Sequence, residues 1–497
     1  MNFGEPASLG QALGLLAPEL VLFVTGLFIL GADAVLRDRE DKSWIPWAAL
    51  IGLAVALVAA LVLWGNQGRV LAVLALDYFA LAVKMVVLLA MMLVVLASDA
   101  YMQAHTRHLG EFYAMLLFVA MAICLLGMAT NLVMIFLAFD FVSITSYILT
   151  GYLRDDERST EAAIKYFLYG AAVSAMMLYG MSWFYGLTGS VDLKEIGVLL
   201  TGAGLAGMEA TLRPVALIAL VMMAAGFAFK IGAAPFHQWA PDAYEGAPTP
   251  VTAFLSVGPK IGGFAVILRV LLTARPPSGL VLLGMDWRAL LMAISALTML
   301  VGNLVALWQT NIKRMLAYSS IAHAGYMLIG VVAASPQGTM AVLLYLAAYA
   351  LTNLGAFAAV IAFSNRIGSD EIEDYAGLST RAPGLAMGLL ICLLSLGGIP
   401  PTAGFVGKLW LFAAAIKAGL LWLAAVGVVN SVISLAYYWK VIRAMYLTPA
   451  QAEERVGLSP ALAVGLTVAV VGVFVIGMAP APFVTWFQTA AQALFAG

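Results

Sequence analysis

Long apolar stretches, separated by short polar connections, run along almost the whole chain. Each stretch is about twenty residues long, which is the length that an α-helix needs to cross the hydrocarbon core of a bilayer. The apolar runs are continuous rather than alternating, which argues against a transmembrane β-barrel. The pattern therefore predicts an all-α, polytopic membrane protein.

The apolar stretches predict about fourteen membrane spans. They cover residues 15–35, 44–64, 77–98, 112–129, 131–152, 161–186, 214–239, 250–273, 286–308, 314–334, 340–363, 383–417, 421–446 and 461–479. Span 7 contains Pro235 and span 12 contains Pro400 and Pro401. Because proline removes a backbone donor and interrupts a helix, both spans are predicted to be broken. The last stretch, 482–495, is amphipathic and is predicted to lie along the membrane interface.

Composition narrows the possible functions. The 497 residues are 63% hydrophobic and 10% charged, with a formal net charge of −1. No polar connection is long enough for a soluble domain, so residues 1–497 are predicted to form a single membrane domain. The net charge provides no basic surface for nucleic acid. The two cysteines are too few to hold an iron–sulfur cluster, and no glycine-rich phosphate-binding loop occurs.

Basic residues gather in the connections that follow odd-numbered spans. Examples are Arg154 and Arg158 after span 5, and Arg366 and Arg381 after span 11. Cytoplasmic loops of membrane proteins carry such an excess of lysine and arginine. The odd-numbered connections are therefore predicted to be cytoplasmic, which places both termini on the outer side of the membrane.

Four ionisable residues fall deep inside the predicted spans. These are Asp140 in span 5, Lys230 in span 7, Lys260 in span 8 and Lys408 in the second half of span 12. A charge near the bilayer centre costs roughly 3 kcal/mol on insertion scales, so such residues normally face protein or water. A low dielectric disfavours the lysine ammonium, whereas a nearby carboxylate favours it. Moving that carboxylate would switch a lysine between binding and releasing a proton, which predicts a proton pump that needs no cofactor.

Other ionisable residues are predicted to lie nearer helix ends. Lys84 is expected to snorkel to the interface, and Lys165 either snorkels or takes part in proton transfer. Glu19 is expected to be interfacial. His323 is placed towards a helix end and is either a proton carrier or a neutral core histidine.

A weak internal symmetry relates span 7, with Lys230 and Pro235, to span 12, with Lys408 and its proline pair. The two spans are five apart, so they occupy the same place in two five-helix units, spans 4–8 and spans 9–13. An odd number of helices per unit makes the second unit inverted in the membrane, and broken helices at matching places point to the transport site. The predicted parts are residues 1–110 (spans 1–3), 111–273 (first repeat), 286–446 (second repeat) and 447–497 (span 14 and the interfacial segment).

Three long stretches resemble the antiporter-like membrane subunits of respiratory complex I. They are AYEGAPTPV at 243–251, NIKRMLAYSSIAHAG at 311–325 and SLGGIPPTAGFVGK at 395–408. Within this family the chain is most similar to subunit N, the mitochondrial subunit 2. The stretches that carry this finer similarity are LAPELVL at 16–22, DDERSTEAAIKYFLYG at 155–170 and YGLTG at 185–189. The resemblance covers nearly the whole chain, in order.

This resemblance implies fourteen helices with two inverted five-helix repeats, and proton translocation coupled to quinone reduction elsewhere. The family's functional residues fall on Asp140, Lys165, Lys230, Lys260 and Lys408, and His323 completes the predicted proton-translocation site. The acid of the fifth helix is usually glutamate in the family, and here it is aspartate. Its side chain is one methylene shorter, so contact with Lys230 is either direct or through water.

The resemblance further implies a subunit of a proton-translocating NADH:quinone oxidoreductase, a translocase with no redox centre in this chain. No cofactor and no metal are expected here, whereas flavin, iron–sulfur clusters and quinone are expected in partner subunits. The expected partners are an adjacent antiporter-like subunit, small membrane subunits and lipids, in a hetero-oligomer of the bacterial plasma (inner) membrane. The alternatives are a subunit of a multisubunit cation/proton antiporter or of a membrane-bound hydrogenase. The subunit-N stretches between residues 155 and 189 favour the first interpretation.

Overall fold

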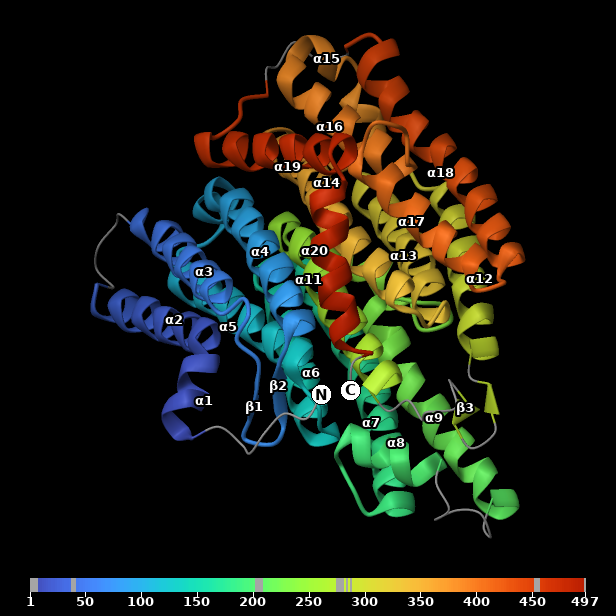
Figure 1. Ribbon diagram of the computed structural model, residues 1–497. Helices are drawn as coiled ribbons and strands as arrows, with labels where there is room; N and C mark the ends of the chain where they lie inside the picture. Colours follow the sequence, from blue (N-terminus) through green and yellow to red (C-terminus); the bar gives the residue numbers. More distant parts are fainter. Residues whose placement is uncertain are drawn as a thin grey trace.

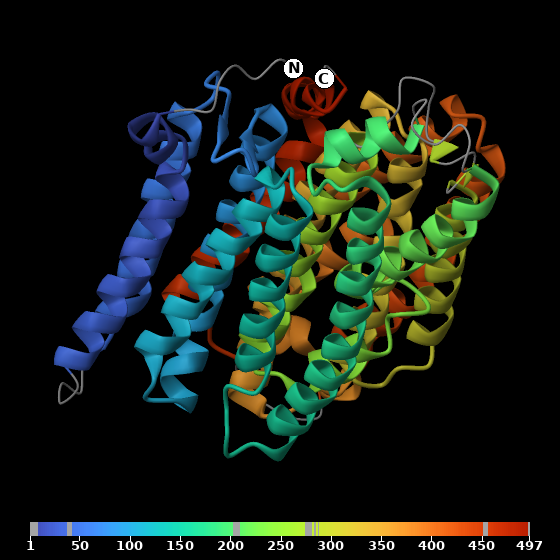
Figure 2. The ribbon, with the colours of Figure 1, turned by 90° about the horizontal axis from the view of Figure 1, so that it is seen from below.

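The computed structural model describes residues 8–36, 42–201, 209–273, 281–282, 285–286, 288–450 and 456–495. It is a bundle of helices that run alongside one another (Figure 1; Figure 2). Among the described residues, 13 helices are long and apolar enough to cross a membrane. The broken pair α16 (Pro383–Gly397) and α17 (Ala403–Lys417) supplies a further span. The predicted all-α membrane fold with about fourteen spans is therefore confirmed.

The N-terminal part contains three of the spans and a small hairpin. Its elements are α1 (Leu9–Leu15), α2 (Ala17–Val35), α3 (Trp44–Val62), β1 (Gly68–Val70), β2 (Leu74–Leu76) and α4 (Tyr78–His105). The strands pair antiparallel, a feature that the hydrophobic pattern did not predict. Helices α2 and α3 lie at one side of the bundle, in dark blue in Figure 2, and expose large apolar side chains such as Phe28 and Ile51. These faces suit contact with lipid or with other membrane subunits.

The middle part holds spans 4 to 8. Its elements are α5 (Leu109–Met128), α6 (Leu132–Thr150), α7 (Glu157–Thr188), α8 (Leu193–Thr201), α9 (Glu209–Ile231), α10 (Trp239–Gly246) and α11 (Thr249–Thr273). Helix α9 stops at Ile231 and α10 starts at Trp239, so the predicted break of span 7 at Pro235 is confirmed. Helix α11 lies in the centre and is buried along its whole apolar window.

The remaining elements follow in the C-terminal part. They are β3 (Val281–Leu282), β4 (Met285–Asp286), α12 (Arg288–Ala306), α13 (Ile312–Val332), α14 (Pro336–Ile367), the 3₁₀ turn η1 (Ile372–Tyr375), α15 (Leu378–Arg381), α16, α17, α18 (Leu421–Leu447), α19 (Pro460–Met478) and α20 (Ala481–Ala493). Span 12 is broken between α16 and α17, as the proline pair predicted. The predicted amphipathic end forms α20, which buries Phe487 and packs on α4 and α14.

Helices α6 and α13 begin in the same way. Asn131 caps α6 by accepting a hydrogen bond from the backbone N–H of Val133, and Asn311 caps α13 through the N–H of Lys313. A short polar side chain at this position satisfies an amide that the first turn leaves free. Each asparagine also forms an isolated antiparallel bridge, Asn131 with Asp192 and Asn311 with Glu371.

The partners of these two bridges are also alike. Asp192 follows α7 and Glu371 follows α14, and both helices are 32 residues long. Each ends at a glycine in the left-handed conformation, Gly189 with φ 69° and Gly368 with φ 74°. Glycine adopts this conformation without a steric penalty, which lets the chain turn back to the asparagine. Helices α6 and α7 therefore match α13 and α14 in order and in local geometry.

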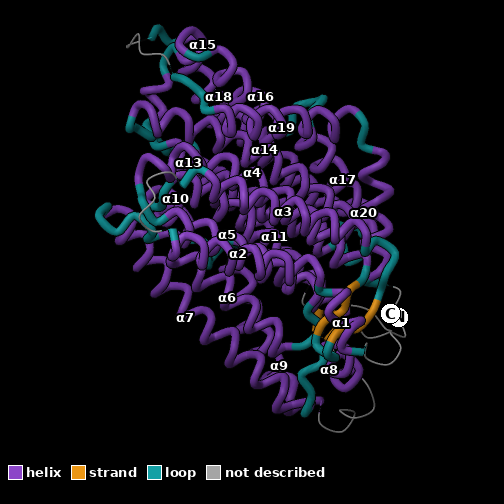
Figure 3. Tube along the Cα trace, turned by 90° about the vertical axis from the view of Figure 1, so that its left-hand side faces the viewer, coloured by secondary structure: helices purple, strands orange, loops and turns teal. Residues whose placement is uncertain are grey.

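Both ends of the described chain lie at the same end of the bundle. Figure 2 shows α1 and α20 at its upper edge, and Figure 3 shows the strands gathered near α1. This placement agrees with an even number of membrane crossings.

Candidate functional site

Lys230 lies in the last turn of α9, directly before the break. Its Nζ donates hydrogen bonds to the carbonyl oxygen of Phe139, at 3.1 Å, and to Oγ of Ser143, at 2.7 Å. The ammonium also lies 4.3 Å from the centre of the Phe139 ring, and the residue is only 1% exposed. A charge this deep must be hydrogen-bonded, and α6 supplies the partners.

The break beside Lys230 is held by side chains. Trp239 Nε1 donates to the carbonyl oxygen of Phe229, at 3.0 Å, and the backbone N–H of Ala234 donates to Thr298 Oγ1, at 3.0 Å. These bonds satisfy backbone groups that a continuous helix would have paired internally. Lys230 therefore sits at a defined helix end rather than at a frayed one.

Asp140 lies on α6 between the two residues that bind Lys230. It is partly exposed, and among the described residues no ion pair joins its carboxylate to Lys230. The two groups are still near enough for the Asp140 charge to act on the lysine. Direct contact, one of the two arrangements expected from the sequence, is therefore not formed here, and Ser143 occupies the position at the ammonium.

We expect Asp140→Asn to slow turnover of the complex severalfold, because a neutral amide no longer favours the charged form of Lys230. Asp140→Glu should be tolerated, since it keeps the charge and extends the reach. The measurement is quinone reduction and proton uptake by membranes that contain equal amounts of complex. An unchanged rate in Asp140→Asn would reduce Asp140 to a structural acid.

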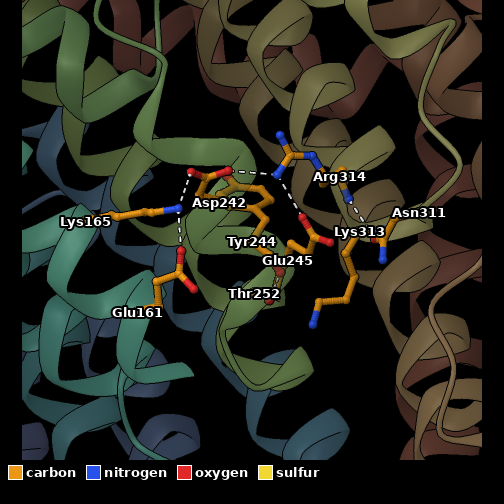
Figure 4. Close-up of polar contacts among 9 residues, drawn as sticks. All are labelled: Glu161, Lys165, Asp242, Tyr244, Glu245, Thr252, Asn311, Lys313 and Arg314. Carbon is orange, nitrogen blue, oxygen red and sulfur yellow. Dashed lines mark hydrogen bonds and ion pairs between the residues drawn. The ribbon is translucent and has the colours of Figure 1, made fainter. Parts of the chain in front are cut away.

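Lys165 lies on α7 in a ladder of charged side chains (Figure 4). Its Nζ is 2.7 Å from Glu161 and 3.2 Å from Asp242, and its side chain is 49% exposed. Arg314 of α13 continues the ladder, 2.7 Å from Asp242 and 2.8 Å from Glu245. These five side chains connect α7, α10 and α13. Lys165 thus belongs to a partly solvated charge cluster and not to the buried interior.

A polar cavity of about 270 Å³ accompanies this ladder. Its lining residues are Arg158, Glu161, Ala162, Lys165, Asp242, Glu245, Gly246 and Arg314. Burial alone would raise the pKa of Asp242, but its hydrogen bonds with Arg314 and Lys165 outweigh burial and place the pKa below its usual range. The Asp242 carboxylate is therefore held in its charged form.

Lys260 lies in the middle of α11. Its Nζ donates to the carbonyl oxygen of Ser320 on α13 and lies 6.0 Å from the centre of the Tyr349 ring. Tyr349 donates in turn to Ser320 Oγ, at 2.8 Å. Lys260 therefore connects α11 with α13 and α14.

His323 lies in mid-helix on α13 and is almost fully buried, at 2% exposure. The sequence placed it near a helix end, which was wrong, because α13 begins at Ile312 and runs nine residues beyond the histidine. Its two ring nitrogens contact the hydroxyls of Tyr345 and Tyr438. A histidine bonded at both nitrogens is fixed in orientation.

Lys408 lies on α17 beside the break of span 12. Its Nζ donates to the carbonyl oxygens of Leu396, at 2.9 Å, and Gly397, at 3.1 Å, and to Ser431 Oγ, at 2.8 Å. The two carbonyls belong to the last turn of α16, where a helix has unpaired acceptors and a partial negative charge. The ammonium therefore caps the half-helix, and Tyr326 covers it at 4.8 Å from the ring centre.

One expectation about the first three spans was wrong. Lys84 does not snorkel, because its side chain forms a buried ion pair with Glu19, with an Nζ to Oε1 distance of 2.8 Å. Lys84 is 0% exposed and Glu19 is 5% exposed at the side chain. The partner lies on another helix, 65 residues away, so position along a single span cannot reveal it.

The sequence also missed residues that hold the site together. Ser143, Tyr345, Tyr438 and Ser431 bind the candidate proton carriers, yet hydroxyl residues are common in helices and carry no distinct signal. Asp77 and Arg269 form a second buried ion pair, at 2.5 Å. The sequence contains one signal for this pair: Asp77 and Arg269, of opposite charge, each fall within an otherwise apolar predicted span.

Spans that are broken into two half-helices beside a buried charge are typical of proteins that transport ions across the membrane. Spans 7 and 12 of this chain have this form, which places it in that class. The family model described as "NADH:quinone oxidoreductase/Mrp antiporter, TM" matches residues 129–434. The chain belongs to this family.

The curated NADH-quinone oxidoreductase subunit N of Trichlorobacter lovleyi is 42% identical over 483 residues, which cover 97% of this chain and 97% of that protein. A chain in respiratory complex I from Thermus thermophilus with bound Aureothin is 33% identical, with a TM-score of 0.77, covering 94% of this chain and 98% of that one. A chain of the Mrp complex from Dietzia sp. DQ12-45-1b shares the fold, with a TM-score of 0.82 at 22% identity over 98% of both chains.

These findings confirm the resemblance to the antiporter-like membrane subunits of complex I, and within them to subunit N. They identify the chain as a multi-pass membrane subunit of the proton-translocating NADH-quinone oxidoreductase type, which works in a hetero-oligomer with other membrane subunits.

Proposed function

We propose that protons cross the membrane in this chain along Lys230, Lys260, His323 and Lys408, with Asp140 adjusting Lys230 and Lys165 acting in the charge ladder. The driving energy comes from quinone reduction elsewhere in the complex. The observation that carries the proposal is the chemistry around the three buried lysines. Each binds carbonyl or hydroxyl oxygens, and among the described residues none forms an ion pair with a carboxylate. Such lysines can exchange a proton because no fixed counter-ion holds them charged.

The two inverted five-helix repeats, residues 111–273 and 286–446, are part of this proposal. The matching caps, bridges and helix ends of α6–α7 and α13–α14 support it, as do the two breaks. Lys230 ends the half-helix α9, and Lys408 caps the half-helix α16 from across the break. Residues 1–110 and 447–497 then flank the repeats without belonging to them.

The setting of the chain is also proposed. The protein lies in the bacterial plasma membrane with both termini on the outer side, which the basic connections after odd-numbered spans support. An adjacent antiporter-like subunit, small membrane subunits and lipids contact its apolar faces. Flavin, iron–sulfur clusters and quinone belong to partner subunits, so the chain contributes proton transfer and no redox step.

The test is Lys408→Met in the whole complex, reconstituted into proteoliposomes. We expect fewer protons pumped per electron pair, because methionine fills the site of the lysine but carries no proton. Lys194→Met, at an exposed position of α8, is the matched control and should pump normally. Normal stoichiometry in Lys408→Met would contradict the proposed route. Purification without flavin and iron–sulfur subunits would instead favour a cation/proton antiporter.

A further inference from the structure

The break of span 7 is held from outside by α12. The backbone N–H of Ala234 donates to Oγ1 of Thr298, which lies 64 residues further along the chain, and both residues are buried. The Thr298 hydroxyl itself donates to the carbonyl oxygen of Ile294, at 2.6 Å, so its oxygen is left to accept. Thr298 is therefore an oriented acceptor for the backbone of the break.

The side of α9 that faces α12 is loosely packed. Phe227 and Ile231 of α9 and Leu291 and Ile294 of α12 line a common apolar cavity, to which α11 and α13 also contribute. Close packing normally fixes the position of a helix, and a cavity removes some of the contacts that would do so. The hydrogen bond to Thr298 therefore has a large share in setting where α9 ends.

The break of span 12 is held in a comparable way by α19. Gly477 lies so close to this break that a Cβ there would overlap the carbonyl oxygen of Pro401. Helix α19 also packs on α17, the half-helix that follows the break. The missing side chain of Gly477 is what permits this approach of one backbone to the other.

The two outer helices have the same relation to the two breaks. Helix α12 forms span 9 and α19 forms span 14, so each comes two spans after the broken one. They are five spans apart, as the two broken spans are, and both are 19 residues long. The relation between the two halves of the chain therefore extends to the helix that holds each break.

Each of these contacts lies beside a candidate proton carrier. Lys230 belongs to the turn before Ala234, and its ammonium depends on the position of that turn to reach its partners on α6. Lys408 reaches back over the break of span 12 to the last carbonyl oxygens of α16. A shift of either break would change the distance between the ammonium and its hydrogen-bond partners.

We propose that Thr298 and Gly477 are positioning residues for proton transfer. Each holds the break of a lysine-bearing span and thereby sets how far the lysine lies from its partners. Neither residue exchanges a proton with a lysine, because both act through the backbone of the break. The inference rests on the proposed proton-translocating function, and it adds a consequence: a movement of α12 shifts the end of α9 and, with it, Lys230.

The experiment compares Thr298→Val with Thr298→Ser in the assembled complex. Valine keeps the shape of threonine but leaves the Ala234 amide unpaired, whereas serine restores the acceptor. In Thr298→Val we expect one amide of the segment 227–241 to exchange with deuterium about tenfold faster, as the loss of a hydrogen bond implies. Proton pumping in proteoliposomes should fall at least about fivefold, because a small misplacement of a reacting group costs up to about a hundredfold in rate. Thr298→Ser should recover both.

Thr467→Val is the matched control for this variant. The Thr467 hydroxyl donates to the carbonyl oxygen of Ala463, one turn back, as Thr298 does to Ile294, but its side chain is exposed. The complex with Thr467→Val should therefore pump at the normal rate and exchange normally in the segment 227–241.

Gly477→Ala tests the contact of α19 separately. The added Cβ displaces the break of span 12, so pumping per assembled complex should fall. Gly465→Ala, on the same helix, is the control, because a Cβ there makes only an ordinary contact, 3.5 Å from Leu96. Normal pumping in Gly477→Ala would remove α19 from the inference. The two Thr298 variants decide the inference for span 7 even if Gly477→Ala yields no assembled complex.

The outcomes separate this inference from the function on which it rests. Faster exchange and slower pumping in Thr298→Val, both recovered in Thr298→Ser, support it. Normal pumping or unchanged exchange in Thr298→Val overturns it. Slow pumping that serine does not recover also overturns it, because the loss then comes from the shape of the side chain. Normal pumping in Lys230→Ala would mean that the proposed function fails, and deuterium exchange would still show whether Thr298 holds the break.

Discussion

Lys230→Ala is expected to reduce coupled proton pumping by at least about tenfold, the lower end of what a positioned proton-transfer group contributes. Alanine removes the ammonium that donates to Ser143 Oγ and to the Phe139 carbonyl, although that carbonyl still accepts from Ser143 Oγ. It also removes the first titratable group of the proposed route. Quinone reduction should fall together with pumping, because the two are coupled. The measurement is dye-reported acidification and quinone reduction in proteoliposomes, scaled to the amount of assembled complex.

Lys417→Ala is the matched control for this variant. Lys417 ends the same kind of half-helix, α17, but its side chain is exposed. The complex with Lys417→Ala should therefore pump protons at the normal rate. Equal activity of Lys230→Ala and Lys417→Ala would remove Lys230 from the route. Ser143→Ala is expected to have a smaller effect than Lys230→Ala, since the Phe139 carbonyl still binds the ammonium.

Arg269→Leu is expected to destabilise the chain by about 3–5 kcal/mol, the range for removing one partner of a buried ion pair. The guanidinium binds both carboxylate oxygens of Asp77, at 2.5 and 3.0 Å, and the carbonyl oxygen of Gly127, at 2.6 Å. Its loss leaves the Asp77 carboxylate, which also caps α4, charged and buried. The amount of complex in membranes and its thermal unfolding in detergent both measure the effect.

A double variant tests this explanation. Asp77→Asn in the Arg269→Leu background removes the stranded charge but keeps an oxygen that can accept from the N–H of Ala80, as Asp77 does at 2.8 Å. The double variant should therefore be more stable than Arg269→Leu alone. If the two substitutions simply add, the cost arises from packing of the arginine and not from the buried charge.

The helices were predictable because a membrane allows few alternatives. Apolar length determines where each span begins and ends, and Pro235, Pro400 and Pro401 mark both breaks. The hairpin of β1 and β2 was not predictable in this way. Each strand is only three residues long. Their pairing depends on the positions in space of the end of α3 and the start of α4.

The candidate site was predictable only in part, for a related reason. A lysine in an apolar run reveals that it needs a partner but does not reveal which one. Lys84 was expected to snorkel to the interface because no acid lies near it along its own span. Its partner, Glu19, is on another helix, 65 residues away. Asp140 was expected to contact Lys230 directly or through water, whereas Ser143, one turn further along α6, accepts the hydrogen bond from the ammonium. Such choices depend on helix rotation and side-chain length, which hydrophobic periodicity does not record.

The Glu19–Lys84 pair has a consequence for the synthesis of the protein. During insertion α2 enters the bilayer well before α4, because the chain is made from its N-terminus. Until Lys84 arrives, Glu19 lacks the partner that it has in the folded chain, and an unpaired acid within a span is costly if it stays charged. We therefore expect α2 to be released from the insertion machinery only after α4 has entered, so that the first three spans leave it together as one unit.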